Sequence, residues 1–155
     1  MRRANWPMAI LLSGAVLLTG CRDPEARVHN QIRHDAEELA IAAADLAHRG
    51  GLRDPKAFET SLRTLPYTTT RGFRDFRWEG GALHVLVSFS SNIQKTEAEG
   101  AGRYSALSCA DFTADSQAVK LVPSGCPAEV PLEYGSSDVT DYRLPEISRK
   151  VQSRW

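Results

Sequence analysis

The spacing of the apolar residues changes once along the chain, near residue 71, and this change sets the fold class. Over residues 24–49 apolar side chains recur at helical intervals, at Val28, Ile32, Ala36, Leu39, Ala43 and Leu46. This is the spacing of one buried helix face. From Arg71 onward apolar residues alternate with polar ones, as in a strand with one buried face. The order predicts an α+β domain with helices packed on an antiparallel sheet.

Two Asp-Pro pairs predict where the helices begin. In Asp23-Pro24 the aspartate suits the N-cap and the proline suits the first helical position. Gly50-Gly51 is a stop signal, so we expect a long helix from Pro24 to Arg49. Asp54-Pro55 predicts a second, short helix that ends at Pro66.

A hairpin is expected around Gly80-Gly81, a two-residue turn signal between two alternating segments. The register pairs Trp78 with Leu83 and Phe76 with Val85 on an apolar face. On the opposite face it pairs Arg77 with His84.

A second hairpin is expected around Asp115-Ser116, which gives about four strands in total. Its register pairs four residues on two faces: Phe112 with Val119, and Asp111 with Lys120. We expect residues 90–102, between the hairpins, to form a long exposed loop. The predicted α+β domain spans residues 24–126. Residues 127–155 are expected to be a partly irregular extension, with either a short helix or a frayed tail from Leu144.

The first twenty residues have the pattern of a signal peptide. Arg2 and Arg3 precede an apolar run that is about half the ~20 residues a spanning helix needs. The segment Leu18-Thr19-Gly20-Cys21 resembles the lipobox of bacterial lipoproteins. The resemblance implies cleavage before Cys21 and a diacylglyceryl group on its sulfur, so that residues 21–23 form a lipidated anchor. A plain secretory signal followed by an unrelated cysteine is the alternative.

This resemblance implies an extracytoplasmic protein held at the cell membrane or outer membrane by its lipid. Once Cys21 is acylated, Cys109 and Cys126 remain as an even pair in an oxidising compartment, where a disulfide is expected. The bond would close a loop of about 17 residues, which chain entropy values at ~3 kcal/mol. Two free buried thiols are the alternative.

Composition and motifs exclude several classes of function. Without residues 1–20 the chain has 17 basic and 19 acidic side chains, so no basic excess points to a nucleic acid partner. No metal-binding histidine motif, nucleotide-binding glycine pattern or nucleophile elbow occurs. No metal, cofactor or catalytic residue is therefore expected, and enzymatic activity is uncertain.

The most distinctive cluster interleaves arginines with aromatic residues at the start of the strand region. It gives a candidate binding face of Arg71, Phe73, Arg74, Asp75, Arg77 and His84. Such residues bind partners through stacking and bidentate hydrogen bonds. A solvated ion network on an outer sheet face is the alternative. The function expected is a non-enzymatic binding or assembly module with an envelope protein partner. A small-ligand sensor or enzyme with a pocket between helix and sheet is the second hypothesis.

The lipid anchor can be tested with Cys21→Ala. We expect this variant to incorporate no labelled palmitate and to move from the membrane fraction to the soluble fraction, because it has no thiol to acylate. Fractionation and palmitate labelling of whole cells measure both effects. A variant that still sediments with membranes would contradict the lipobox interpretation.

Overall fold

The expected long helix is present in the computed structural model, which describes residues 23–128 and 139–152. Helix α1 spans Pro24–His48, and the Asp23 carboxylate accepts a hydrogen bond from the backbone N–H of Glu25 at 3.2 Å. Helix α2 spans Pro55–Thr64 and is capped by Asp54. Residues 1–22, with the predicted signal segment and Cys21, lie outside the described residues.

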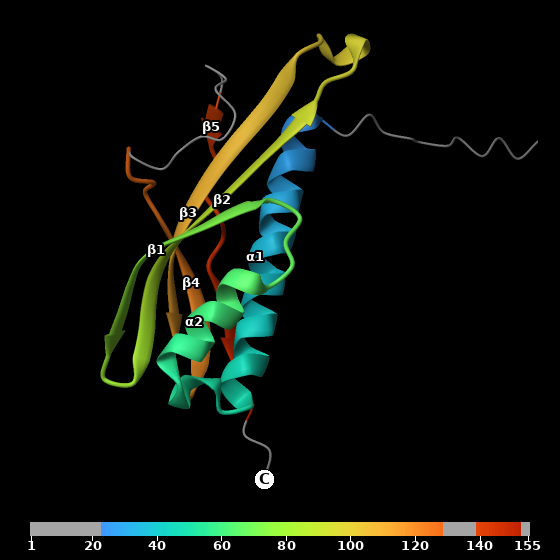
Figure 1. Ribbon diagram of the computed structural model, residues 1–155. Coiled ribbons are helices and arrows are strands. Elements are labelled where there is room, and N and C mark those ends of the chain that lie inside the picture. The colour runs from blue at the N-terminus through green and yellow to red at the C-terminus, as the bar shows by residue number, and fades with distance from the viewer. Residues whose placement is uncertain (1–22, 129–138, 153–155) are drawn as a thin grey trace, which may run out of the picture.

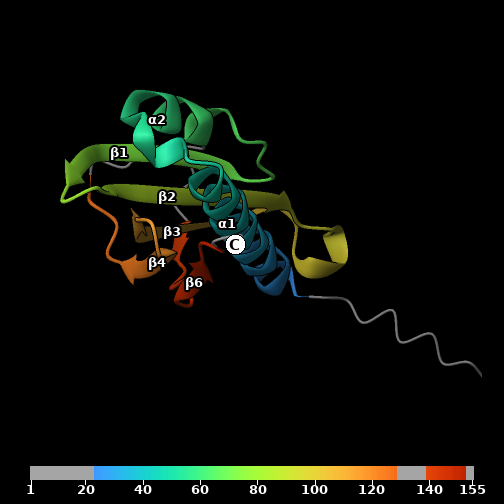
Figure 2. The same ribbon diagram turned by 90° about the horizontal axis from the view of Figure 1, so that it is seen from below.

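Over the described residues the sheet is antiparallel apart from one short strand, and six strands are present where about four were expected. The strands are β1 (Thr70–Glu79), β2 (Ala82–Gln94), β3 (Arg103–Ala114), β4 (Ala118–Ser124), β5 (Val139–Asp141) and β6 (Ile147–Lys150). Their order is β1-β2-β3-β4-β6, and β5 pairs with β3 in parallel. Helix α1 lies along one face of this curved sheet, and α2 lies beside its lower half (Figures 1 and 2). The α+β prediction is therefore confirmed.

The core lies between α1 and the sheet. Small residues on α1, among them Ala36, Ala40 and Ala43, are completely buried and let the helix approach the strands closely. The sheet supplies the larger buried side chains, such as Phe89 and Phe112. No helix among the described residues is long and apolar enough to cross a membrane.

The prediction of a long loop over residues 90–102 is wrong. Strand β2 continues to Gln94 and β3 begins at Arg103, so only a short turn with the 3-10 helix η2 (Glu97–Glu99) joins them. The buried position of β2 in this region is a serine, Ser91, so the sequence lacks the apolar alternation that marks a strand. The turn lies beside the first turn of α1, where Arg27 forms a 2.7 Å ion pair with Glu99 (Figure 1). The hydrogen bond from the backbone N–H of Thr96 is the main cause that lowers the pKa of the Glu99 carboxyl, and the positive charge of Arg27 lowers it further.

The prediction of a short helix or a frayed tail from Leu144 is also wrong. Residues Ile147–Lys150 form β6, which pairs with the free edge of β4. Leu144 and Ile147 are buried in the core that α1 covers. The main-chain groups of β4 and these two apolar side chains together favour a strand over the helix that Pro145 suggested.

The second hairpin exists with a register two residues away from the expected one. Phe112 pairs with Leu121 instead of Val119, and Asp111 pairs with Val122 instead of Lys120. The carboxylate of Asp115 causes the difference, because it accepts from the backbone N–H groups of Gln117 (2.7 Å) and Ala118 (2.8 Å) and so lengthens the turn. A shift of two residues leaves every side chain on its predicted face.

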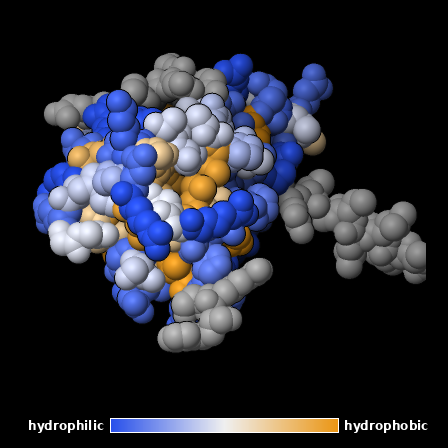
Figure 3. Space-filling view, turned by 60° about the horizontal axis from the view of Figure 1, so that its bottom comes forward, coloured by the Kyte–Doolittle hydropathy of each residue, from blue (hydrophilic) through white to orange (hydrophobic). Residues whose placement is uncertain are grey.

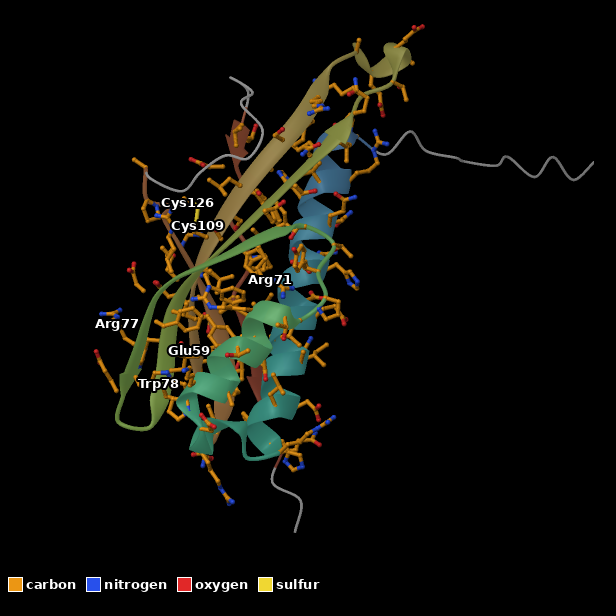
Figure 4. The ribbon with its side chains drawn as sticks, in the orientation of Figure 1. Glu59, Arg71, Arg77, Trp78, Cys109 and Cys126 are labelled. Atoms are coloured by element: carbon orange, nitrogen blue, oxygen red, sulfur yellow. A yellow bond between two sulfur atoms is a disulfide. The ribbon has the colours of Figure 1, made fainter. Side chains whose placement is uncertain are left out.

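The disulfide between Cys109 and Cys126 is present, as expected. It lies on the face of the sheet that α1 does not cover (Figure 4). Leu107, Leu86 and Val139 pack beside it in a small apolar cluster. The bond therefore holds the chain that leaves β4 against the outer side of β3.

The turn at Asp115 gives a test of stability against pH. The N–H groups of Ala118 and Gln117 lower the pKa of Asp115 from 3.8, so its contribution to stability is complete above pH 3.8 and disappears as the pH falls through the lowered value. We expect Asp115→Ala to reduce the free energy of unfolding by about 1 kcal/mol at neutral pH. The difference should shrink in strong acid, which urea denaturation at several pH values measures. Asp111→Ala, which changes an exposed aspartate on the preceding strand β3, is the matched control. A deficit for Asp115→Ala that is the same at every pH would contradict the assignment.

Candidate functional site

A β-bulge in β1 divides the predicted binding face into two. Arg77 pairs with His84 and Trp78 with Leu83, as expected, but Arg74 pairs with Leu86, so β1 has one extra residue between these pairs. Asp75 and Phe76 therefore lie together opposite Val85, and the predicted one-to-one pairing of Phe76 with Val85 is wrong. Asp75 takes up the extra residue with a left-handed φ of 57°. The alternation of side chains changes sides at this point.

The bulge brings three aromatic residues of β1 to the side covered by the helices. Phe73 and Phe76 contact each other with their ring centres 5.9 Å apart. The Trp78 ring packs edge-on against Phe58 of α2, and its Nε1–H donates to Glu59 at 2.7 Å (Figure 4). Without the extra residue, Phe73 and Phe76 would lie on opposite faces. Phe73 is thus part of the core and not of the predicted outer face.

Arg71 is also turned inward, where it forms a buried ion pair with Asp35 of α1. Both side chains are almost fully buried, at 1% and 2% exposure. The guanidinium Nη2–H donates to Asp35 Oδ1 at 2.8 Å, and Nε–H donates to Oδ2 at 3.3 Å. The same carboxylate accepts from the hydroxyl of Thr69 at 2.7 Å and from the backbone N–H of Thr68 at 3.2 Å. Arg71 is therefore a structural residue that ties β1 to α1.

Three of the remaining predicted residues, Asp75, Arg77 and His84, line a polar depression of about 410 Å³ on the outer face of the sheet, whereas Arg74 is outside its lining. We call it the outer-face pocket and define it by Asp75, Arg77, His84 and Asp111. Arg77 of β1, His84 of β2 and Thr113 of β3 are consecutive neighbours across the sheet. The Arg77 side chain points away from the helices (Figure 4).

The outer-face pocket is lined by both acidic and basic side chains. Two carboxylates, a guanidinium and an imidazole share its rim, and Leu86 contributes an apolar part of the lining. Lys120 lies opposite Thr113 in the next strand, and Val122 is 41% exposed nearby on β4. Acidic, basic and apolar groups side by side suit the rim and centre of a protein interface.

The arrangement gives less support for a metal or catalytic site. Among the described residues, no group of three His, Cys, Asp or Glu side chains gathers as a metal ion requires. The outer-face pocket contains Asp75, His84 and Asp111, but these three side chains come from separate strands and do not gather closely enough to hold a metal ion.

Comparisons with protein-family models, with curated proteins and with solved structures find no match for this chain. The functional interpretation therefore rests on the residues themselves.

Two residues of these clusters were not among the predicted site residues. Asp35 lies between Ile32 and Leu39 on the apolar face of α1, and an acidic residue at such a position is a signal of a buried partner. Asp111 was expected to pair with Lys120; it pairs with Val122 on β4 and with Leu86 on β2, and it lines the pocket beside Leu86.

The buried pair predicts an asymmetric response to mutation. Asp35→Leu should reduce the free energy of unfolding by about 3–5 kcal/mol, because it leaves the Arg71 guanidinium buried without its carboxylate. The double variant Asp35→Leu/Arg71→Met should recover most of that loss, since no charge stays buried. Urea denaturation of the four proteins of this double-mutant cycle measures the coupling. Additive losses would show that the pair is not coupled.

Proposed function

We propose that this protein is an extracytoplasmic lipoprotein, anchored through Cys21, that binds an envelope protein through the outer face of its sheet. The observation that carries the proposal is the outer-face pocket, where three of the six predicted residues gather with Asp111 on the face opposite the helices. The activity is binding, without a chemical step. Its lipid anchor attaches it to the cell membrane or outer membrane.

The position of the pocket relative to the proposed anchor supports this function. Cys21 precedes α1 by only three residues, so the bilayer would lie near the first turns of the helix. At this level Gln31 of α1 accepts a hydrogen bond from Ser91 of β2. His84 is seven residues earlier on β2, which is about 23 Å along a strand. The pocket would thus lie well away from the lipid surface, where a partner protein can reach it.

The layer between helix and sheet offers less support for a small-ligand sensor or enzyme. The side chains in this layer are closely packed, and Val87, Phe89 and Ala110 have no exposed surface. Its buried ionic groups, Asp35 and Arg71, bind each other. The second hypothesis therefore has no observation in its favour among the described residues.

Another candidate surface lies at the lower end of the molecule, where α1 ends and α2 begins. Hydrophobic residues reach the surface there between hydrophilic ones (Figure 3). A shallow groove between α1 and β6 includes Ile41, which is 48% exposed, together with His48 and Lys150. The outer-face pocket is favoured because its opposite charges provide orientation as well as contact.

Crosslinking in intact cells tests the proposed interface with the full lipidated chain. We expect Arg77→Glu and Val122→Asp each to reduce capture of the partner by at least about tenfold, because they place a new negative charge in the contact. Affinity purification with quantitative mass spectrometry measures the capture.

Arg53→Glu, an exposed arginine beside α2, is the matched control and should capture the partner normally. Equal capture by the outer-face variants and by the unchanged protein would exclude this face as the interface.

A further inference from the structure

A second depression, separate from the outer-face pocket, lies where β1 begins. It has a volume of about 280 Å³ and is open to solvent, between residues 67–70 and residues 90–92. Strands β1 and β2 pair only as far as Thr70 and Ser90, whereas β2 continues along β3 to Gln94. We call this depression the hydroxyl cleft, because most of the side chains that line it carry a hydroxyl group. One wall is β2, and the other is the chain that separates from β2 at this point.

The wall on the β1 side is held by the buried carboxylate of Asp35. This carboxylate accepts from the Thr68 N–H and the Thr69 hydroxyl, at 3.2 and 2.7 Å. The opposite wall belongs to the longest pair of strands, and Ser91 there donates to Gln31 of α1 at 2.6 Å. Both walls are therefore fixed before any ligand binds, which reduces the ordering cost of binding.

The lining of the hydroxyl cleft is entirely uncharged. It consists of hydroxyl side chains and one amide, from Tyr67, Thr68, Thr69, Thr70, Ser90, Ser91 and Asn92. Hydroxyl and amide groups both donate and accept hydrogen bonds, so they match a ligand whose own groups do the same. The closest cation along the chain, the guanidinium of Arg71, is 1% exposed and bound to Asp35. A charged ligand would find no opposite charge in this lining.

Tyr67 adds an aromatic surface to the cleft. Its side chain is the most exposed of the large apolar residues described, at 60%. An exposed ring combines an apolar face with a hydroxyl group, a combination suited to ligands that are apolar on one side and polar on the other. The pyranose ring has this character, because its C–H groups form a face and its hydroxyls lie around the edge.

We propose that the hydroxyl cleft binds a neutral carbohydrate, with one sugar ring against Tyr67. The hydroxyl groups of the sugar bond to Thr68, Ser90 and Asn92, because the Thr69 and Ser91 hydroxyls already donate to Asp35 and Gln31. The small volume fits a single ring of a longer chain whose other rings extend into solvent. Such a site would let the anchored protein contact an envelope glycan and its protein partner at the same time. The site does not depend on the outer-face pocket or on any protein partner.

The test is a titration of the full lipidated chain in lipid nanodiscs with two neutral probes, a β-1,4-linked tetramer of N-acetylglucosamine and an α-1,4-linked tetramer of glucose. Isothermal titration calorimetry measures the affinities. Saturable binding of either tetramer is expected, and the preferred one identifies the type of glycan. Tyr67→Ala and Asn92→Ala should each weaken the binding by about tenfold.

Ile41→Ala, an exposed apolar residue on α1, is the matched control and should bind as the unchanged protein does. Tyr67→Phe keeps the ring and should lose less affinity than Tyr67→Ala. Failure of both tetramers to saturate at millimolar concentration, or equal affinity of Tyr67→Ala, would overturn the proposal.

The two proposals fail separately. Tyr67→Ala should still capture the protein partner, and Arg77→Glu should still bind the carbohydrate.

Discussion

The buried contact between Asp35 and Arg71 determines how the two halves of the chain meet. Asp35 lies on the buried face of α1, and Arg71 lies at the start of the sheet. Removing two charges from water costs free energy that their attraction recovers only with good geometry and further hydrogen bonds. Thr68 and Thr69 supply these additional bonds. One carboxylate therefore sets both the position of α1 on the sheet and the path of the chain into β1.

The bulge at Asp75 has a comparable effect on the distribution of functions along β1. Upstream of it Arg71 and Phe73 face the helices, while downstream of it Arg77 faces outward. A strand without the extra residue would place Arg71 and Arg77 on one face and Phe76 and Phe73 on opposite faces. The left-handed backbone of Asp75 is the local cost of placing three aromatic rings in the core and leaving a charged group outside.

The sequence was sufficient for features that depend on local pattern, and insufficient for those that depend on partners far along the chain. Both helices, the turn at Gly80-Gly81 and the disulfide follow from caps, spacing and cysteine parity. The bulge did not follow, because the Phe76 ring packs against Arg63 of α2, which local spacing does not indicate. Strand β6 did not follow either, since four residues become a strand only beside the exposed edge of β4. Asp35 was the available signal for the inward turn of Arg71.

Both proposed sites depend on regions where the regular pairing of the sheet is interrupted. The outer-face pocket lies below the bulge of β1, and the hydroxyl cleft lies where β1 separates from β2. At an interruption, side chains and main-chain groups that would otherwise satisfy neighbouring strands become available to a ligand. The closely packed core supplies the rigidity, because Asp35 and the aromatic residues on the helix side fix each interruption from within. A charged site and a neutral site on one small domain would then recognise different molecules without competing for the same residues.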